Sequence, residues 1–305
     1  MTIKVGLVGA GWWAHDVHAP LHQSGEGTEL VGVWARDSHK AASFAAEFGV
    51  KAFESFAELL SCCDAVDFAV PPHVQAPLAI EAAQAGKALI LEKPLAPDLA
   101  SALRMVEAIE ENHTPHIVCF TRRYNHETVD FLDDVAALAV NGDILGMQGH
   151  YVHGGLLEGG ILPPSGTWRH DFHGILMDLG PHALNLAAAA LGKVTKVRAQ
   201  SGRFVTITAE HESGVCSQIA LSGSVDVNAD DFTETVFADS GIAHFDVRGQ
   251  DHAECWTNIH EEFVNAVHNG TPVTVDAREA LHLQAILEAA RDSHESGVTE
   301  LVAHY

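Results

Sequence analysis

A glycine-rich turn between a strand and a helix constrains this chain more than any other feature. The apolar run Ile3–Val8 leads directly into Gly9–Ala14, which reads GAGWWA and fits the pattern G-x-G-x-x-A. In this pattern the first glycine permits a tight turn, the second lets the backbone approach a pyrophosphate, and the last small residue allows close helix packing. The N-terminus of the following helix offers N–H donors and a positive dipole to an anion. We therefore predict a dinucleotide site at Gly9, Gly11, Trp12 and Trp13, the alternative being a glycine turn that only packs.

Short β-rich runs alternate with helical segments from the N-terminus to about residue 120. We expect strands at residues 3–8, 29–34, 65–70, 88–91 and 116–120. Ser38 is placed to cap a helix over residues 40–48, and Asp98 to cap one with Leu99, Leu103, Val106 and Ile109 on a single face. Such alternation is typical of a parallel sheet with crossover helices on both faces. We therefore predict an α/β fold with a dinucleotide-binding Rossmann domain over residues 1–120.

The pattern changes in the second part of the chain. One helix, a Gly/Pro-rich stretch and another helix precede strands with alternating apolar residues: Val205, Ile207 and Ala209, then Ala243, Phe245 and Val247. This alternation is typical of an antiparallel sheet with one solvated or partner-covered face. Two late helices are expected at about residues 253–268 and 277–293, the second opened by a capping box from Asp276 to Glu279. Residues 121–305 are thus predicted to form an α+β domain.

The charge and cysteine content exclude several classes of partner. The 17 lysines and arginines against 41 aspartates and glutamates leave a formal charge of −24, which repels nucleic acid and anionic membranes. The five cysteines are odd in number and lack CxxC spacing, so we expect reduced thiols. We find no export signal and no run of 18 apolar residues. We therefore expect a cytoplasmic protein that binds neither nucleic acid nor membranes.

The end of the second expected strand bears on the choice of cofactor. An acidic residue here would bind the ribose 2′-hydroxyl of NAD, but that position is occupied by Ala35. Arg36 can instead pair with a 2′-phosphate, and Ser38 can donate a hydrogen bond to it. The sequence therefore favours NADP, with NAD as the alternative if Asp37 takes the ribose and Arg36 is solvated.

Three further motifs occur in order along the chain. They are Glu92-Lys93-Pro94 after the strand at 88–91, Arg122-Arg123-Tyr124-Asn125 after the strand at 116–120, and Asp178-Leu-Gly-Pro-His182 in the second half. Together with the glycine turn they resemble the Gfo/Idh/MocA oxidoreductases, over essentially the whole chain. The resemblance implies a Rossmann domain followed by an α+β domain with a large, open, mostly antiparallel sheet, and an active site between them. It also implies a homodimer or homotetramer formed through that sheet.

The resemblance assigns roles to individual residues. It makes Lys93, Asp178 and His182 the catalytic set. Cofactor contacts are also expected at Val70, Pro71, Glu92 and Lys93, and substrate contacts at Arg123, Tyr124 and Asp178. Three departures from the family pattern concern the substrate: Phe172-His173 within the usual glycine run, Asn185 for an aspartate, and Gln75 for a frequent histidine.

The chemistry of these residue types suits hydride transfer. Oxidising a secondary alcohol leaves a hydroxyl proton to be moved, so a base with a pKa near neutrality is needed, and His182 meets that requirement. Asp178 lies four residues earlier and shares a face with it if the segment is helical; alternatively, Pro181 starts the helix. Lys93 follows a parallel strand at its carboxyl end, where its ammonium can stabilise charge on the reacting oxygen. For each residue the alternative is a packing or surface role.

Two other groups of residues have side chains that could bind a substrate or a metal. Trp168-Arg169 offers a flat aromatic ring and a forked donor suited to a polyhydroxylated ligand, although a structural role explains the pair equally well. The spacing of His15, His18 and His22 would suit a metal on a helix face, but no carboxylate or cysteine clusters with them in the sequence. We therefore predict no metal.

These observations lead to one functional hypothesis and two rivals. We expect an NAD(P)-dependent oxidoreductase that transfers hydride between nicotinamide and a secondary alcohol or ketone of a sugar-like or polyol substrate. The first rival is a non-catalytic dinucleotide-binding sensor of the same fold, which retention of Lys93, Asp178 and His182 argues against. The second is a dehydrogenase or reductase for another substrate, such as a dihydrodiol or an imine.

Overall fold

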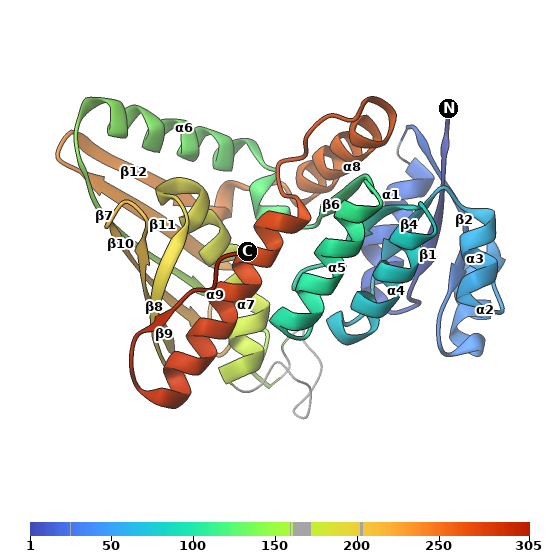
Figure 1. Ribbon diagram of the computed structural model, residues 1–305, viewed down its shortest axis with the longest axis horizontal. Helices are drawn as coiled ribbons and strands as arrows, with labels where there is room; N and C mark the ends of the chain where they lie inside the picture. The colour runs from blue at the N-terminus through green and yellow to red at the C-terminus, as the bar shows by residue number, and fades with distance from the viewer. Residues whose placement is uncertain (25, 159, 161–171, 202–203) are drawn as a thin grey trace. The chain divides into compact units, whose positions relative to one another are not determined.

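The computed structural model describes residues 1–305 except residues 25, 159, 161–171 and 202–203 (Figure 1). Its contacts divide the chain into two compact units: unit 1 holds Met1–Thr121 and Ala253–Leu281, and unit 2 holds Arg122–His252 and His282–Tyr305. The predicted contiguous division at residue 120 differs from these units in one respect, because Ala253–Leu281 returns to unit 1.

Unit 1 is built on a parallel sheet. Its strands are β1 (Ile3–Val8), β2 (Thr28–Trp34), β3 (Lys51–Ala52), β4 (Ala65–Phe68), β5 (Ala88–Leu91) and β6 (His116–Val118), and they lie in the order β3-β2-β1-β4-β5-β6. Every residue of β4 and β5 is buried, as expected for parallel strands covered on both faces. The strand order reverses direction between β1 and β4, and ligands bind at such a switch point beyond the carboxyl ends of the strands.

The helices in the first part of unit 1 are the π-helical turn η1 (Ala14–His18), α1 (Ala19–Ser24), α2 (Ser38–Phe48), α3 (Phe56–Cys62), α4 (Pro72–Gln84) and α5 (Leu99–Glu111). At α2, α3 and α5, a side chain before the helix accepts from the first free backbone N–H groups. Asp98 caps α5 as predicted, accepting from the N–H of Ser101 at 2.7 Å. The predicted cap of α2 is wrong by one residue. Asp37, rather than Ser38, accepts from the N–H groups of His39 and Lys40, at 3.0 and 3.1 Å, because its carboxylate stands one position ahead of the first turn.

Unit 2 carries the mostly antiparallel sheet that was expected. Its strands are β7 (Ile144–Val152), β8 (Val194–Gln200), β9 (Val205–His211), β10 (Cys216–Ser222), β11 (Asp231–Ala238), β12 (Gly241–Asp246) and β13 (Glu300–Leu301), in the order β12-β11-β7-β10-β9-β8-β13. Among these neighbours, β7 and β10 are parallel and the other pairs are antiparallel. The alternation predicted for β9 holds: Val205, Ile207 and Ala209 are buried, whereas Thr206 and Thr208 are exposed.

Helices cover one face of this sheet. Helix α6 (His126–Asn141) contacts β11 and β12, and α7 (Phe172–Leu191) contacts β7, β9, β10 and β11. The 3₁₀ turns η2 (Thr121–Arg123) and η4 (Val247–Gly249) complete the described elements before the last two helices. The apolar side chains that alternate along the strands therefore form the core of unit 2 beneath α6 and α7.

Most of the helix before the last one, and the first residues of the last helix, belong to unit 1. Helix α8 (His252–Asn269) places His260 Nε2 2.8 Å from Oγ1 of Thr28, at the start of β2. The start of α9 (Ala277–Ser296) donates the N–H of Ala277 to His116 Nε2 at 3.0 Å. Helical periodicity predicted both helices, but it identifies only which face of a helix is buried, and not the core against which that face packs.

Helix α7 contains a long apolar stretch. Its stretch Gly174–Leu191 is long and apolar enough to cross a membrane by length and composition alone. However, 78% of this stretch is buried inside the structure. An apolar helix at the centre of a core meets the same criteria, and the contacts of α7 with four strands of unit 2 fit that role.

Candidate active site

The glycine turn places two glycines under different constraints. Gly9 has φ +121°, and a Cβ on it would lie 2.4 Å from the carbonyl oxygen of Ala69, so the protein itself requires glycine here. A Cβ on Gly11 would meet no atom within 4 Å. The protein alone therefore leaves room for a side chain at Gly11. That open space is what a pyrophosphate approaching the backbone needs, and the turn fits a dinucleotide.

The residues after β2 include the polar groups that are available to bind the ribose of a dinucleotide. Asp37 uses one carboxylate oxygen to cap α2, while Arg36 and Ser38 are exposed and Ala35 is half-buried. The guanidinium of Arg36 is thus accessible for a phosphate, and no carboxylate stands at position 35.

The Glu92-Lys93 segment is joined to the glycine turn by a side-chain hydrogen bond. Trp13 donates its indole N–H to Glu92 Oε1 at 2.7 Å, across 79 residues of sequence. The other carboxylate oxygen of Glu92 accepts from the backbone N–H of Lys93 at 3.0 Å. Two segments predicted separately to contact the cofactor therefore belong to one cluster, at the carboxyl ends of β1 and β5.

The remaining predicted cofactor contacts lie around the same turn. A Cβ on Gly9 would come within 3.1 Å of Val70 Cγ1, and Pro71 is the residue before the first turn of α4. Trp12 is 57% exposed, and its ring packs edge-on against Trp13 with 5.0 Å between centroids. An exposed aromatic side chain beside an open backbone turn is available to a ligand.

In unit 2, Asp178 and His182 lie on one continuous helix. Helix α7 begins at Phe172, so Pro181 lies inside it, and the alternative that Pro181 starts the helix is wrong. The spacing of four residues places the two side chains on the same helical face, about 5–6 Å apart at Cβ. His182 is 8% exposed, and its ring lies 6.0 Å from that of Tyr151.

The arginines after β6 connect this helix to the sheet. Arg123 donates to the side-chain oxygen of Asn185 on α7 at 2.9 Å, one turn beyond His182. Arg122 and the hydroxyl of Tyr151 both donate to the same oxygen of Asp230, each at 2.7 Å. Burial raises the pKa of Tyr151 above its usual range, so the phenol stays protonated and acts as a donor.

Comparison with known proteins decides the family. Residues 3–120 match the family model described as an oxidoreductase family with an NAD-binding Rossmann fold, and residues 139–249 match the GFO/IDH/MocA C-terminal domain. The chain belongs to the Gfo/Idh/MocA oxidoreductases. The fold and the nicotinamide dinucleotide cofactor predicted from the sequence are thereby confirmed.

Several relatives of this Gfo/Idh/MocA protein are named as dehydrogenases of sugars or polyols. An inositol 2-dehydrogenase from Corynebacterium glutamicum (strain R) is 26% identical over 307 residues, covering 89% of this chain and 88% of that protein. A glucose-6-phosphate 3-dehydrogenase from Bacillus subtilis (strain 168) is 29% identical over 191 residues, covering 60% of this chain and about half, 52%, of that protein. A levoglucosan dehydrogenase solved with NADH and L-sorbose has the same fold, with a TM-score of 0.88 at 18% identity and full coverage of both chains.

One departure from the Gfo/Idh/MocA pattern has a structural role that sequence reasoning missed. The side chain of Gln75 is buried and donates to the carbonyl oxygens of Glu92 and Leu95, at 2.8 and 3.0 Å. Its own carbonyl oxygen accepts from the N–H of Glu92 at 2.8 Å. An amide has both a donor and an acceptor, so Gln75 can hold the backbone on both sides of Lys93. Lys93 is half-buried, and its peptide bond to Pro94 is cis.

A second departure, Asn185, accepts from Arg123 as a neutral partner where an aspartate would form an ion pair. The third, Phe172-His173, has side chains outside the described residues, and so do Trp168 and Arg169. Tyr124 is 5% exposed, and its predicted substrate contact remains a prediction. Lys93 belongs to unit 1 and the pair Asp178–His182 to unit 2, and their shared catalytic role likewise remains a prediction.

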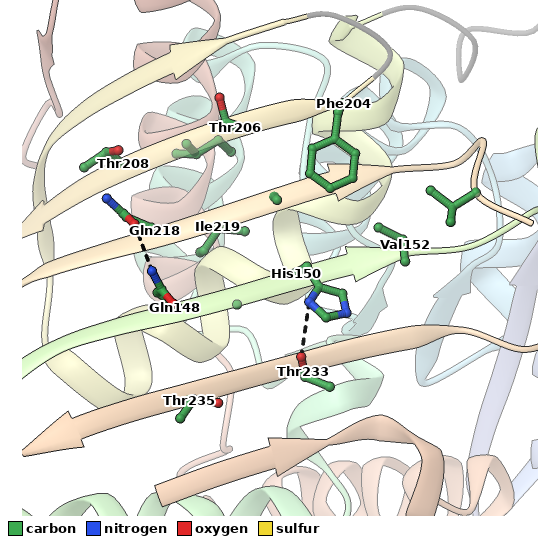
Figure 2. A pocket seen from close by; sticks show the side chains of 14 residues that line it. Gln148, His150, Val152, Phe204, Thr206, Thr208, Gln218, Ile219, Thr233 and Thr235 are labelled. Carbon is green, nitrogen blue, oxygen red and sulfur yellow. Dashed lines mark hydrogen bonds between the residues drawn. The ribbon is translucent and has the colours of Figure 1, made fainter. Parts of the chain in front are cut away.

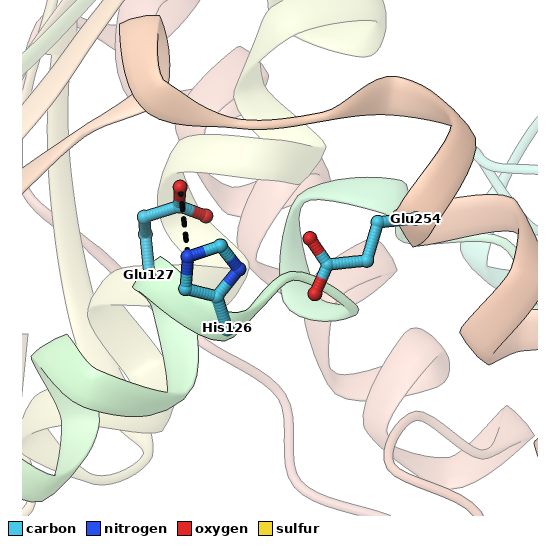
Figure 3. A group of neighbouring side chains, drawn as sticks. All are labelled: His126, Glu127 and Glu254. Carbon is cyan, nitrogen blue, oxygen red and sulfur yellow. Dashed lines mark ion pairs between the residues drawn. The ribbon is translucent and has the colours of Figure 1, made fainter.

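Two further groups of ionisable side chains contain histidines. His15, considered above as part of a metal spacing, instead contacts Glu47 at 2.8 Å on the surface, whereas His18 and His22 face the buried Asp67. At the start of α6, His126 lies 3.3 Å from Glu127 (Figure 3), and an exposed pair of this kind contributes little to stability. Glu254, also drawn there, belongs to α8 of unit 1, whereas His126 and Glu127 belong to unit 2.

Proposed function

We propose that this oxidoreductase transfers hydride between NADP and a secondary alcohol or ketone of a sugar-like or polyol substrate. One observation carries the proposal: the open glycine turn and the Glu92-Lys93 segment form a single cluster through the hydrogen bond from Trp13. This arrangement supports a cofactor held at Gly9–Ala14 with a lysine ammonium presented next to it. The polyol and sugar substrates named for the relatives support the substrate class.

The proposed mechanism uses residues from both units. Bound NADP supplies the hydride donor or acceptor. Lys93 is proposed to donate a hydrogen bond to the reacting oxygen and to stabilise negative charge as it develops there. His182 is proposed to take or return the hydroxyl proton, with Asp178 orienting the imidazole or a neighbouring substrate hydroxyl. The side chains proposed to contact the substrate are Arg123, Tyr124, Trp168 and Arg169.

The choice of NADP over NAD rests on the end of β2. Ala35 provides no acceptor for a ribose hydroxyl, and the exposed Arg36 can pair with a 2′-phosphate. Asp37, which the NAD alternative requires, already accepts two backbone N–H groups with one of its oxygens.

The assay that tests the proposal is direct. Purified protein is mixed with NADPH or NADP and a panel of ketoses, inososes, inositols and aldose phosphates, and absorbance at 340 nm is followed. Turnover with a sugar or polyol is the expected result. Tight cofactor binding without turnover of any panel member would favour a sensor, and turnover of a dihydrodiol or imine alone would change the substrate class.

We also propose a homodimer or homotetramer assembled through the sheet of unit 2, and a cytoplasmic location. The sheet face opposite α6 and α7 carries a hollow lined by polar and apolar side chains, among them Gln148, Thr206, Gln218 and Phe204 (Figure 2). A broad sheet face of this kind suits pairing with a second copy. The five free cysteines fit a reducing compartment. Light scattering of the purified protein measures the assembly directly.

A further inference from the structure

One histidine is buried between two carboxylates, and one of these carboxylates is Glu92 of the Glu92-Lys93 segment. His18, at the end of η1, places Nδ1 2.8 and 2.9 Å from the two carboxylate oxygens of Asp67 on β4. Its Nε2 lies 3.2 Å from Glu92 Oε1. His18 and Asp67 are fully buried, and Glu92 is 9% exposed. Both ring nitrogens of one imidazole therefore face carboxylate oxygen.

This geometry fixes the protonation state of the imidazole. A neutral imidazole has only one N–H, so donation from both nitrogens requires the imidazolium. Burial lowers the pKa of His18, but the charge of Asp67 and the hydrogen bonds that His18 donates to Asp67 and Glu92 outweigh it and raise the pKa to about 10. Burial likewise raises the pKa of Asp67, yet His18 and His22 together hold it below its usual range. The pair is thus an imidazolium and a carboxylate at neutral pH.

Three other ionisable groups lie around this pair. His22 on α1 lies 2.9 Å from Asp67 by its Nε2, and its Nδ1 contacts the hydroxyl of Thr28 at 3.1 Å. His260 on α8 reaches the same hydroxyl, and burial followed by the proximity of His22 lowers its pKa to about 4. Cys119, after β6, has its pKa raised by burial and by Glu92 and Asp67, so it stays a thiol.

The imidazolium acts on the candidate active site through Glu92. Glu92 Oε1 accepts from His18 and from the indole N–H of Trp13, while Oε2 accepts from the N–H of Lys93. If Nε2 of His18 lost its proton, its lone pair would face Oε1 and repel it. The carboxylate would then lose the donor that fixes it, and the two segments it joins would lose their common support.

We propose that His18 is a positioning residue, whose imidazolium is set by Asp67 and fixes Glu92, and through Glu92 the backbone of Lys93 and the ring of Trp13. The catalytic consequence rests on the role proposed above for Lys93. A side chain that holds the reacting groups through another residue is expected to change kcat about 10- to 100-fold when it no longer keeps them in place.

The Asp67→Asn variant tests the proposal, because it removes the charge that keeps His18 protonated while preserving size. In this variant the pKa of His18 should fall into the range from about 5.5 to about 8.5, in which the wild-type imidazole stays protonated. We expect a new alkaline limb in the pH profile of kcat, with kcat close to wild type at the acid end and at least about tenfold lower at the alkaline end. Asp64→Asn, an exposed carboxylate just before β4, is the matched control and should leave the profile unchanged.

A nuclear magnetic resonance titration separates this inference from the proposed function. In Asp67→Asn, the amide resonance of Lys93 and the indole resonance of Trp13 should shift with the same pKa as the ring of His18, whether or not any substrate is turned over. Two results would overturn the inference even if the dehydrogenase assay succeeds. One is that the Lys93 and Trp13 resonances do not shift as His18 titrates, and the other is that wild-type His18 titrates near its ordinary pKa. The wild-type measurement needs no variant to fold. Conversely, coupled titration with no turnover of the substrate panel would leave the positioning network intact and refute the proposed function.

Discussion

Gly9 and Gly11 differ in the room that the protein leaves for a side chain, and the first prediction follows from this difference. Gly11→Val should weaken NADPH binding more than tenfold, because its side chain would occupy the space a pyrophosphate needs, while the protein itself has room for the new Cβ. Gly9→Ala should instead destabilise the fold, since its Cβ would collide with the carbonyl of Ala69 at a positive φ. Fluorescence titration and thermal unfolding measure the two effects. Unchanged cofactor affinity in Gly11→Val would contradict the assignment.

Residues 35 and 36 give a prediction about cofactor choice. Ala35→Asp combined with Arg36→Ala should move the ratio of kcat/KM values from NADPH toward NADH, because the new carboxylate repels a 2′-phosphate and accepts from a ribose hydroxyl. Steady-state kinetics with both cofactors measure the ratio. A wild-type enzyme that already prefers NADH would show the argument to be wrong.

Glu234 on β11 is a buried carboxyl whose two oxygens lack hydrogen-bond partners among the described residues. Burial raises its pKa well above the usual range, so it is protonated in the folded state and ionised in the unfolded state at neutral pH. A raised folded pKa means that its contribution to stability is full below the unfolded pKa and is lost as pH rises, by at most about 1.4 kcal/mol per pH unit.

The Glu234→Gln variant should therefore gain stability over wild type as pH increases from about 5 to about 8. Urea unfolding across this range measures the difference, and Glu210→Gln, a partly exposed residue of the same sheet paired with Lys196, is the control. Parallel stability curves for wild type and Glu234→Gln would mean that the carboxyl does not titrate as its burial requires.

At the scale of elements, the cap of α2 supplies a test of a single corrected residue. Asp37→Ala should cost about 1 kcal/mol of unfolding free energy, because two N–H groups lose their acceptor, whereas Ser38→Ala should change stability only slightly. Chemical denaturation of both variants measures the difference. Equal losses would mean that Ser38 shares the capping role.

Element type was predictable where a short-range pattern decides it, and less so where tertiary contacts do. The alternation in β9 and the cap at Asp98 are local signals, and both were read correctly. The two-residue strand β3 has too few residues to show a period. Pro181 removes one hydrogen bond inside α7, and sequence alone could not say that packing against the strands of unit 2 keeps the helix continuous.

At the scale of the whole molecule, sequence motifs predicted the family and many of the candidate site residues, but not the groups that support them. The contacts of Glu92 with Trp13, Gln75 and His18 join segments far apart in the chain, and no spacing rule foretells them. The spacing of His18 and His22 is visible in the sequence, but it does not identify their partner Asp67, which lies on β4 in a separate segment of the chain. An acidic residue within an otherwise apolar β-run is the signal that would have found that partner.

The catalytic proposal requires residues from both units, and its prediction follows from that division. His182→Ala should lower kcat by about 10²–10⁴, the range expected for losing a general acid or base, and should leave NADPH affinity intact because the glycine turn belongs to unit 1. Lys93→Met should lower kcat comparably without unfolding the protein, since a half-buried lysine at a strand end contributes little to stability. His126→Ala, at the exposed start of α6, is the matched control. Stopped-flow single turnovers at 340 nm separate the chemical step from product release, and a wild-type rate of hydride transfer in either active-site variant would remove that residue from the mechanism.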